Sequence, residues 1–351
     1  MVYLFNLLMV PLYYWILRVM NNRQKANELF MWIVALHAIM FRALANPNNY
    51  TDAPHYYRAF RIVSGWSLKH TVLDMNEFTN WGQGYLLYNW ALSHLTDDPK
   101  MLYVVASVIA VGGVMIYYKK TLHTVLTPIL FYLSYQMMYL HGFGAIRQHM
   151  AIPFLLFSLY YIERTKISLC FAITAMLLHP SCMVFFPFYL VHKMSKSMSY
   201  STVAILSLSL FLVGRFFIAA ILSFFPRYEP YLRANPQNNI VPMLLVSFMI
   251  LLLYEANVFS RNVRQSDRNL LLFLLYGFGL TVFCVGIPGA GRLSLPVVYV
   301  VPTAIGILYK YGGRNRDEYH LCVIGLALLV IAGLYLAVDS GHTILQHYSL
   351  L

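Results

Sequence analysis

The segment that decides the fold runs from His141 to Pro187 and reads HGFGAIRQHMAIPFLLFSLYYIERTKISLCFAITAMLLHPSCMVFFP. Two apolar stretches flank a short basic link, Glu163–Lys166, and polar side chains stand at the far end of each stretch. This pattern predicts a helical hairpin in a membrane, with Arg147 and His179 at its two tips. Because a cation and an imidazole at the same bilayer depth are costly unless they line a cavity, we interpret these tips as a functional site.

The composition is that of a polytopic membrane protein. Of the 351 residues, 60% are hydrophobic and 11% are charged, and the mean hydropathy is +0.61, which excludes a soluble enzyme. We expect residues 1–351 to form a single integral membrane domain with a first outer loop at 46–84 and a second at 226–239. The net charge of +12 is scattered over short loops, so it does not indicate a nucleic-acid partner.

The apolar runs predict an all-α fold with about 12 transmembrane helices. A further short amphipathic run, Gly84–Leu95, is predicted to lie in the membrane interface or to re-enter without crossing. The twelve runs fall at about 1–20, 28–46, 101–118, 122–140, 148–163, 167–179, 180–192, 201–223, 240–259, 270–287, 292–310 and 319–338.

The distribution of basic residues predicts the orientation of the chain. With this helix count, more than half of the 25 Lys and Arg residues fall in six short loops on one side, as the positive-inside rule expects. Six arginines nevertheless face outward, namely Arg58, Arg61, Arg147, Arg227, Arg233 and Arg292. Arg147 and Arg292 each follow a glycine-rich turn and open a helix, and a guanidinium beside helix N–H groups makes a site suited to phosphate. Arg61 and Arg227 are equally well explained as side chains that extend to the interface.

Two residues are candidates for proton transfer. Asp52 precedes Tyr56 and Phe60 at helical spacing, so it is either a general base or sugar ligand, or else a helix cap or an ion pair with Arg58. His179 ends an apolar run. It is either a general acid, a general base or a hydrogen-bond donor to phosphate, or else a structural hydrogen-bond partner of the opposing turn. The aromatic residues near Tyr56 either stack on sugar rings or belong to an interfacial belt.

No nucleotide-binding glycine loop, HExxH zinc site, serine triad spacing or DxD metal pair occurs in the sequence. We therefore expect no metal and no cofactor. An active site that faces outward has no access to cytoplasmic nucleotide sugars, so a sugar donor for it has to be lipid-linked.

Several short motifs occur in the order seen in a known family. From about residue 46 to about residue 300, the chain resembles the EpsG family of bacterial exopolysaccharide, capsule and Wzy-like O-antigen polymerases. In that family an acidic residue usually precedes the Gly-Tyr pair, whereas this chain has Gln83 nearby, which leaves the role to Asp52, Gln83 or another group. The motifs are Asp52-x3-Tyr56-x3-Phe60, Gly84-Tyr85, Ile146-Arg147-Gln148-x2-Ala151, the run into His179-Pro180-Ser181 and Pro187, and Arg292-Leu293.

The resemblance implies a multi-pass polymerase of the bacterial inner membrane, with a GT-C-like cavity and an active site that face the periplasm. It would join oligosaccharide repeat units carried on undecaprenyl diphosphate, with membrane lipids and a chain-length regulator as further partners. The expected catalytic residues are Asp52, Arg147, His179 and Arg292. The expected substrate-binding residues are Tyr56, Arg58, Gln83, Tyr85, Gln148, His149 and Arg233.

Other functions stay open. An O-antigen ligase or a glycosyltransferase that uses polyprenyl-phosphate sugars would work on similar lipids, although many ligases have a large late outer loop that this chain lacks. A flippase for lipid-linked oligosaccharides would need paired repeats and charges near the bilayer midplane. A membrane acyltransferase is a further class, for which His179 is the only hint.

Overall fold

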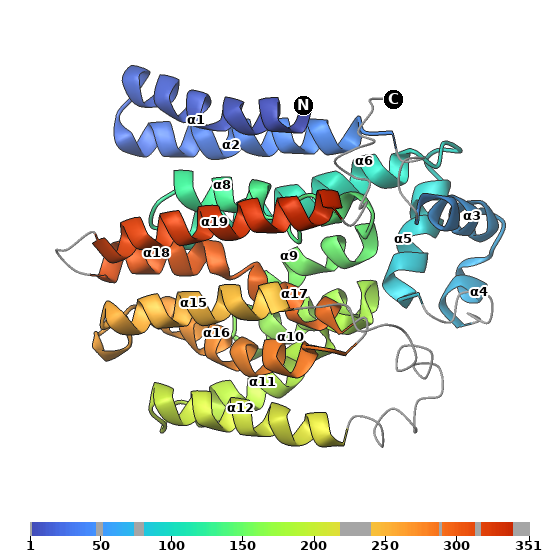
Figure 1. Cartoon of the computed structure of the whole chain (residues 1–351). Helices are drawn as coiled ribbons and strands as arrows, with labels where there is room; N and C mark the ends of the chain where they lie inside the picture. Colours follow the sequence, from blue (N-terminus) through green and yellow to red (C-terminus); the bar gives the residue numbers. More distant parts are fainter. Residues whose placement is uncertain are drawn as a thin grey trace. The chain divides into compact units, whose positions relative to one another are not determined.

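The computed structural model describes residues 2–46, 52–73, 81–217, 240–287, 290–312 and 317–339. All regular structure in these ranges is helical (Figure 1). Four helical stretches among them are long and apolar enough to cross a membrane, and further apolar helices are shorter. The described residues are therefore all-helical and contain helices suited to a polytopic membrane protein, whereas the expected number of about 12 transmembrane helices stays a prediction. The four stretches are Arg23–Ala43, Met101–Thr121, Gln265–Cys284 and Gly291–Tyr311.

The residues pack into two compact units, which are described separately. Unit 1 comprises residues 1–121, 129–183 and 332–351, and unit 2 comprises residues 122–128 and 184–331. The expectation of a single membrane domain stays a prediction.

The longer helices of unit 1 coincide closely with the predicted apolar runs. The run predicted at 101–118 is one helical stretch in which a π-helical turn, Val108–Gly112, joins two α-helices. The run predicted at 122–140 is the exception, because its α-helix is only nine residues long. The helices are α1 (Val2–Met20), α2 (Arg23–Ala43), α6 (Met101–Ser107), α7 (Gly113–Thr121), α8 (Leu126–Ser134, which begins in unit 2), α9 (Ile146–Tyr160) and α10 (Thr165–Leu178).

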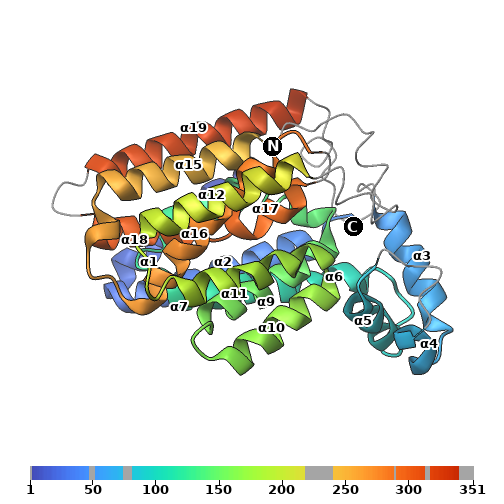
Figure 2. The ribbon, with the colours of Figure 1, turned by 90° about the horizontal axis from the view of Figure 1, so that it is seen from below.

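The described residues of the predicted first outer loop, 52–73 and 81–84, are largely helical. The loop contains α3 (Ala53–Ser64) and α4 (Leu68–Leu73), and α5 (Gln83–Ser93) follows it. These three short helices form a group of their own beside the start of α6 (Figure 2). With 11 residues, α5 is too short to cross a membrane, since a full span needs about 20 residues. This length agrees with the prediction of an interfacial or re-entrant segment.

The predicted hairpin is confirmed as the pair α9 and α10. Ser158 and Ser168 face each other where the two helices meet, and each hydroxyl donates to the other residue's carbonyl at 2.7 Å. α10 ends at Leu178, and His179 is extended, as expected for a residue that precedes a proline. Arg147 and His179 therefore stand at the same end of the hairpin, away from the link at Glu163–Lys166.

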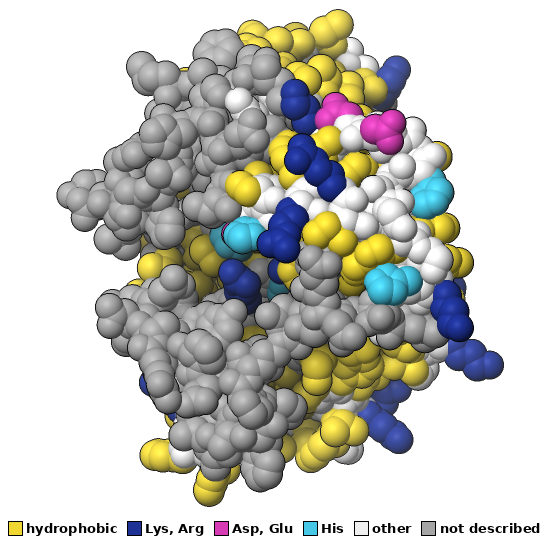
Figure 3. All heavy atoms as spheres, turned by 90° about the vertical axis from the view of Figure 1, so that its right-hand side faces the viewer, with side chains coloured by type: hydrophobic (Ala, Val, Ile, Leu, Met, Phe, Trp, Pro, Cys, Tyr) yellow, Lys and Arg dark blue, Asp and Glu magenta, His cyan; other side chains and the backbone are white. Residues whose placement is uncertain are grey.

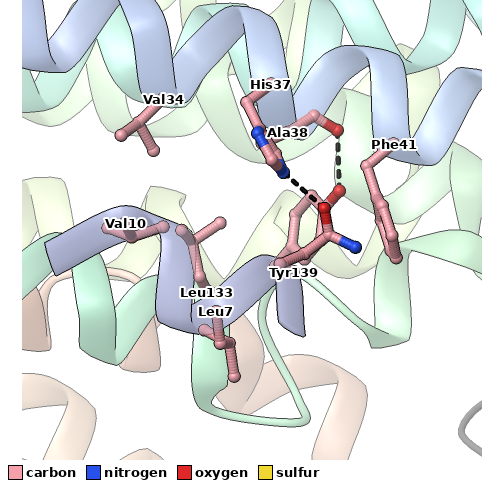
Figure 4. Close-up of a pocket in the computed structure, with 9 residues that line it drawn as sticks. Leu7, Val10, Val34, His37, Ala38, Phe41, Leu133 and Tyr139 are labelled. Atoms are coloured by element: carbon pink, nitrogen blue, oxygen red, sulfur yellow. Dashed lines mark hydrogen bonds between the residues drawn. The ribbon is translucent and has the colours of Figure 1, made fainter. Parts of the chain in front are cut away.

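The first two helices are joined by a polar contact inside an apolar surrounding. The imidazole of His37 on α2 lies 2.7 Å from Asn6 Oδ1 and 3.0 Å from the hydroxyl of Tyr13, both on α1. A cavity of about 20 Å³ lies beside it, with room for about one water molecule. The hydroxyl of Tyr139 donates to the carbonyl of Ala38 at 2.6 Å along its wall (Figure 4). We assign His37 a structural role.

Two basic segments of unit 1 meet at the end opposite Arg147. The ammonium group of Lys120, at the end of α7, lies 5.9 Å from the ring centroid of Tyr160, at the end of α9. The basic end of α7 is therefore next to the basic link of the hairpin. This grouping is the one that the predicted orientation requires.

Unit 2 is also helical. Its helices are α11 (Phe185–Met194), α12 (Tyr200–Phe216), α15 (Ile240–Glu255), α16 (Gln265–Cys284), α17 (Gly291–Val298), α18 (Val301–Tyr311) and most of α19 (Asp317–Asp339). The run predicted at 292–310 is thus divided into α17 and α18. α12 packs along α16 so closely that a Cβ on Gly279 would lie 2.7 Å from the carbonyl oxygen of Ser207.

Charged side chains join the two ends of α16 to its neighbours. At its start, the fully buried carboxylate of Asp267 accepts hydrogen bonds at 3.0 Å from His123, Arg264 and Tyr311. At its end, Arg215 of α12 donates to the carbonyl of Val282 at 3.1 Å. A cation at a helix C-terminus is favourable, so Arg215 has a structural explanation that its sequence context did not provide.

We expect Asp267→Ala to destabilise the protein by about 3 kcal/mol, because the substitution removes the acceptor of three hydrogen bonds in a buried network. The thermal unfolding midpoint of the purified protein in detergent measures the effect. Asp97→Ala is the matched control, since Asp97 is exposed, and it should leave the midpoint unchanged. Equal midpoints for the two variants would contradict this role.

Candidate functional site

An aromatic cage surrounds the guanidinium of Arg147 in unit 1. Its central carbon lies 4.6 Å from the ring centroid of Trp81, 5.9 Å from that of Tyr85 and 6.0 Å from that of Tyr56. The three rings also pack against one another. Such contacts stabilise a cation by about 0.5–2 kcal/mol each. The first outer loop and the tip of the α9–α10 hairpin thus meet at one cation.

The local sequence explains why the cage forms. Tyr56 and Phe60 of α3 are one helical turn apart and are 3% and 2% exposed, which confirms that they share a buried face. Gly82 and Gly84 flank the start of α5, where the backbone passes α10 closely. A Cβ on Gly82 would lie 2.1 Å from the carbonyl oxygen of Leu177, so a glycine is needed there to bring Trp81 and Tyr85 to Arg147.

Tyr85 is fully buried and is not a base. Burial raises the pKa of its phenol well above the usual value, and the nearby charge of Arg147 opposes this shift more weakly. The phenol therefore stays protonated at neutral pH. Tyr56 is buried by the same cage, so both tyrosines contact Arg147, and their expected contact with sugar stays a prediction.

A chain of polar contacts joins the two tips of the hairpin beside the cage. The side-chain amide of Gln148 donates to the hydroxyl of Ser181 at 3.5 Å, and that hydroxyl lies 2.7 Å from Nδ1 of His179. The predicted proximity of the Arg147 turn and His179 is thus confirmed. His179 thus reaches Gln148 of the opposing turn through its own neighbour Ser181, and its role in chemistry stays a prediction.

Two imidazoles form a second polar pair at the same end. Nδ1 of His141 lies 2.9 Å from Nε2 of His149, so one ring donates a hydrogen bond to the other. His149 is buried and His141 is half-buried. A hydrogen-bonded imidazole pair accepts one proton more readily than two, because two adjacent cations repel.

A second arginine is buried beside these histidines. Arg42, in the last turn of α2, is 2% exposed. Its guanidinium carbon lies 5.9 Å from the ring centroid of Phe143. A Cβ on Gly142 would come within 2.6 Å of Arg42 Nη1 and 3.0 Å of the His149 ring, so Gly142 makes room for both groups. Arg42 and Arg147 together make this end of unit 1 strongly positive.

The remaining predicted residues of the first outer loop lie around the cage. Asp52 is half-buried at the N-cap position of α3, where its side chain makes no capping hydrogen bond to the described backbone. Arg58 and Gln83 are exposed. Seen from the side that carries α3, α4 and α5, Lys, Arg and His side chains are exposed among apolar ones (Figure 3).

A comparison with protein families adds to this geometry. The model of the EpsG family matches residues 28–349. The chain belongs to the EpsG family. No curated protein and no solved structure matches it. Membership indicates a polysaccharide-polymerase type of role, with glycosyltransferase-like chemistry.

Some expected site residues of this EpsG protein are not brought together by the structure. Arg292 is exposed in the first turn of α17, and it belongs to unit 2, so its proximity to Arg147 stays a prediction. Arg227 and Arg233 lie outside the described residues.

Sequence reasoning missed three residues that the structure places around Arg147 and His149, namely Arg42, Trp81 and His141. Arg42 lies within an apolar run, which drew attention away from it. Its position near the outward end of that run could have indicated that it faces the same side as Arg147. Trp81 directly precedes the Gly82–Gly84 turn, and the small residues there indicated a close backbone approach.

We expect Gly82→Ala to destabilise the protein by about 1–3 kcal/mol, the usual cost of overpacking, because the new methyl group would clash with the backbone of α10. The thermal unfolding midpoint in detergent measures this effect. Gly144→Ala is the matched control, since a Cβ there meets no atom within 4 Å. A midpoint for Gly82→Ala equal to that of the control would show that the close approach does not occur.

Proposed function

We propose that this protein is the polymerase that joins oligosaccharide repeat units carried on undecaprenyl diphosphate. The reaction would occur at the outer, periplasmic face of the bacterial inner membrane. The observation that carries the proposal is the pair of arginines, Arg42 and Arg147, at the end of unit 1 opposite its basic loops. The positive-inside rule disfavours arginines on this side of the membrane, so they need another explanation. A lipid-linked sugar carries a diphosphate, which is an anion that these arginines could bind.

The cage suits an arginine that binds a leaving group. A guanidinium binds phosphate through N–H groups in its plane, while aromatic rings contact its face. The cage holds the side chain in one place before the substrate arrives, which lowers the cost of ordering it during binding. Backbone N–H groups at the start of α9 add to the positive potential.

The chemical step is a glycosyl transfer. The bond between the anomeric carbon of the growing glycan and its diphosphate breaks, and the electron pair leaves with the diphosphate. A new bond forms between this carbon and a hydroxyl oxygen at the non-reducing end of the next lipid-linked unit. The proton of that hydroxyl passes to a base on the protein. Arginines near the diphosphate stabilise the charge that develops on the leaving group.

Arg147→Ala and Arg292→Ala test the diphosphate assignment. Each variant should lose about 10²-fold in rate, as expected for the loss of one group that stabilises transition-state charge. Cells that carry either variant should insert the protein normally and accumulate single repeat units instead of long chains, which gel electrophoresis of the extracted polysaccharide measures.

Arg164→Ala is the matched control, because Arg164 is exposed in the basic link at the other end of the hairpin. It should leave the chain-length distribution unchanged. Long polymer in both Arg147→Ala and Arg292→Ala cells would overturn the assignment. Unflipped lipid-linked units on the cytoplasmic leaflet of a deletion strain would favour a flippase instead.

Asp52 and His179 are the two candidates for the base, and Asp52→Asn and His179→Gln distinguish them. Removal of the base should lower kcat by about 10²–10⁴-fold with little change in KM, since a general base acts in the transition state. The other substitution should change kcat by much less. The measurement is the rate of polymerisation by the purified protein, and retention of full kcat by both variants would exclude both residues.

A further inference from the structure

A second basic site lies on α3, on the face that points away from the cage. Pro54, Tyr57, Arg58, Arg61 and Ile62 line an open hollow of about 490 Å³. Arg58 and Arg61 are exposed. At 100° per residue they lie roughly half a turn around the helix from Tyr56. One helix therefore carries a wall of the Arg147 cage on one side and a pair of cations on the other.

The groups in the hollow fit a phosphate head with an apolar chain attached. Two arginines one turn apart bind adjacent phosphates, while Pro54 and Ile62 supply apolar surface. Burial, and more weakly the negative charge of Asp98, raise the pKa of Tyr57 to about 12. The hydroxyl oxygen itself is buried, so Tyr57 contributes ring surface to the hollow.

A polymerisation step involves two lipid diphosphates, and this inference rests on the proposed function. The donor's diphosphate leaves from the reacting carbon, so it must lie at the reaction centre. The acceptor reacts at its non-reducing end, whereas its diphosphate is attached to its reducing end. The acceptor's diphosphate must therefore lie one repeat unit away from the reaction centre, in a site of its own.

We propose that the hollow formed by Tyr57, Arg58 and Arg61 binds the diphosphate of the acceptor lipid, while Arg147 and Arg42 hold that of the donor. α3 then separates two anion sites, and the acceptor oligosaccharide extends past this helix towards the cage. In this arrangement Arg58 and Arg61 are binding residues that do not touch the reacting atoms.

The first experiment counts bound lipid. Native mass spectrometry of the purified protein with undecaprenyl diphosphate should detect two bound molecules for the wild type. The double variant Arg58→Gln/Arg61→Gln should bind one, and Arg147→Ala should also bind one. The matched control Lys69→Gln/Lys100→Gln removes two exposed charges nearby and should still bind two.

The second experiment compares two acceptors. With the lipid-linked unit, KM for the acceptor should rise at least about tenfold in Arg58→Gln/Arg61→Gln, the factor expected for a lost charge-assisted contact. With the same oligosaccharide lacking lipid and diphosphate, the double variant and the wild type should have the same KM. A change for both acceptors, or for neither, would overturn the proposal.

These outcomes separate the inference from the proposed function. Two bound lipids in the double variant would overturn the acceptor site and leave the polymerase assignment intact. A wild-type protein that binds two lipids without extending a glycan would contradict the polymerase, while the lipid count would still test the hollow. Displacement of the second lipid by an equal concentration of phosphatidylglycerol would show a general site for anionic lipids and would overturn the proposal.

Discussion

The contact between the guanidinium of Arg147 and the rings of Tyr56, Trp81 and Tyr85 connects the main parts of unit 1. It joins the first outer loop to the α9–α10 hairpin, although Tyr56 precedes Arg147 by 91 residues and Trp81 precedes it by 66. A cation at this depth requires partners, because an isolated charge in an apolar region is costly. The rings stabilise the guanidinium without neutralising its charge, so the contact that stabilises the fold also keeps a positive charge at this end of unit 1.

The positive charges of the molecule fall into two groups with different explanations. Those in the basic loops, such as Lys120 beside Tyr160, agree with the rule that sets membrane topology. Arg42 and Arg147 lie at the other end of unit 1, with histidines as neighbours. An arginine on the side that the positive-inside rule disfavours usually has a functional reason. Arg215, by contrast, is explained by its hydrogen bond to the end of α16.

The hairpin and the buried face of α3 were predictable because their signals are local. Apolar runs, the basic link and the spacing of Tyr56 and Phe60 each define an element without reference to the rest of the chain. The partners of Arg147 were not predictable, since they depend on which segments approach across long sequence separations. Trp81 lies 66 residues before Arg147, and only the fit of Gly82 against Leu177 brings it there. Arg42 was missed because hydropathy describes a run as a whole and does not show which neighbours surround one side chain.

The lengths of α9 and α10 have a consequence for the surrounding lipid. These helices have 15 and 14 residues, or about 22 Å and about 21 Å of rise, against a hydrocarbon core of roughly 30 Å. α10 exposes Ile167, Ile173 and Leu177 on its surface, so a lipid-facing α10 would be shorter than the hydrocarbon core around it. A bilayer adjusts to such a mismatch by thinning locally. Headgroups beside α10 would then lie closer to the level of Arg147.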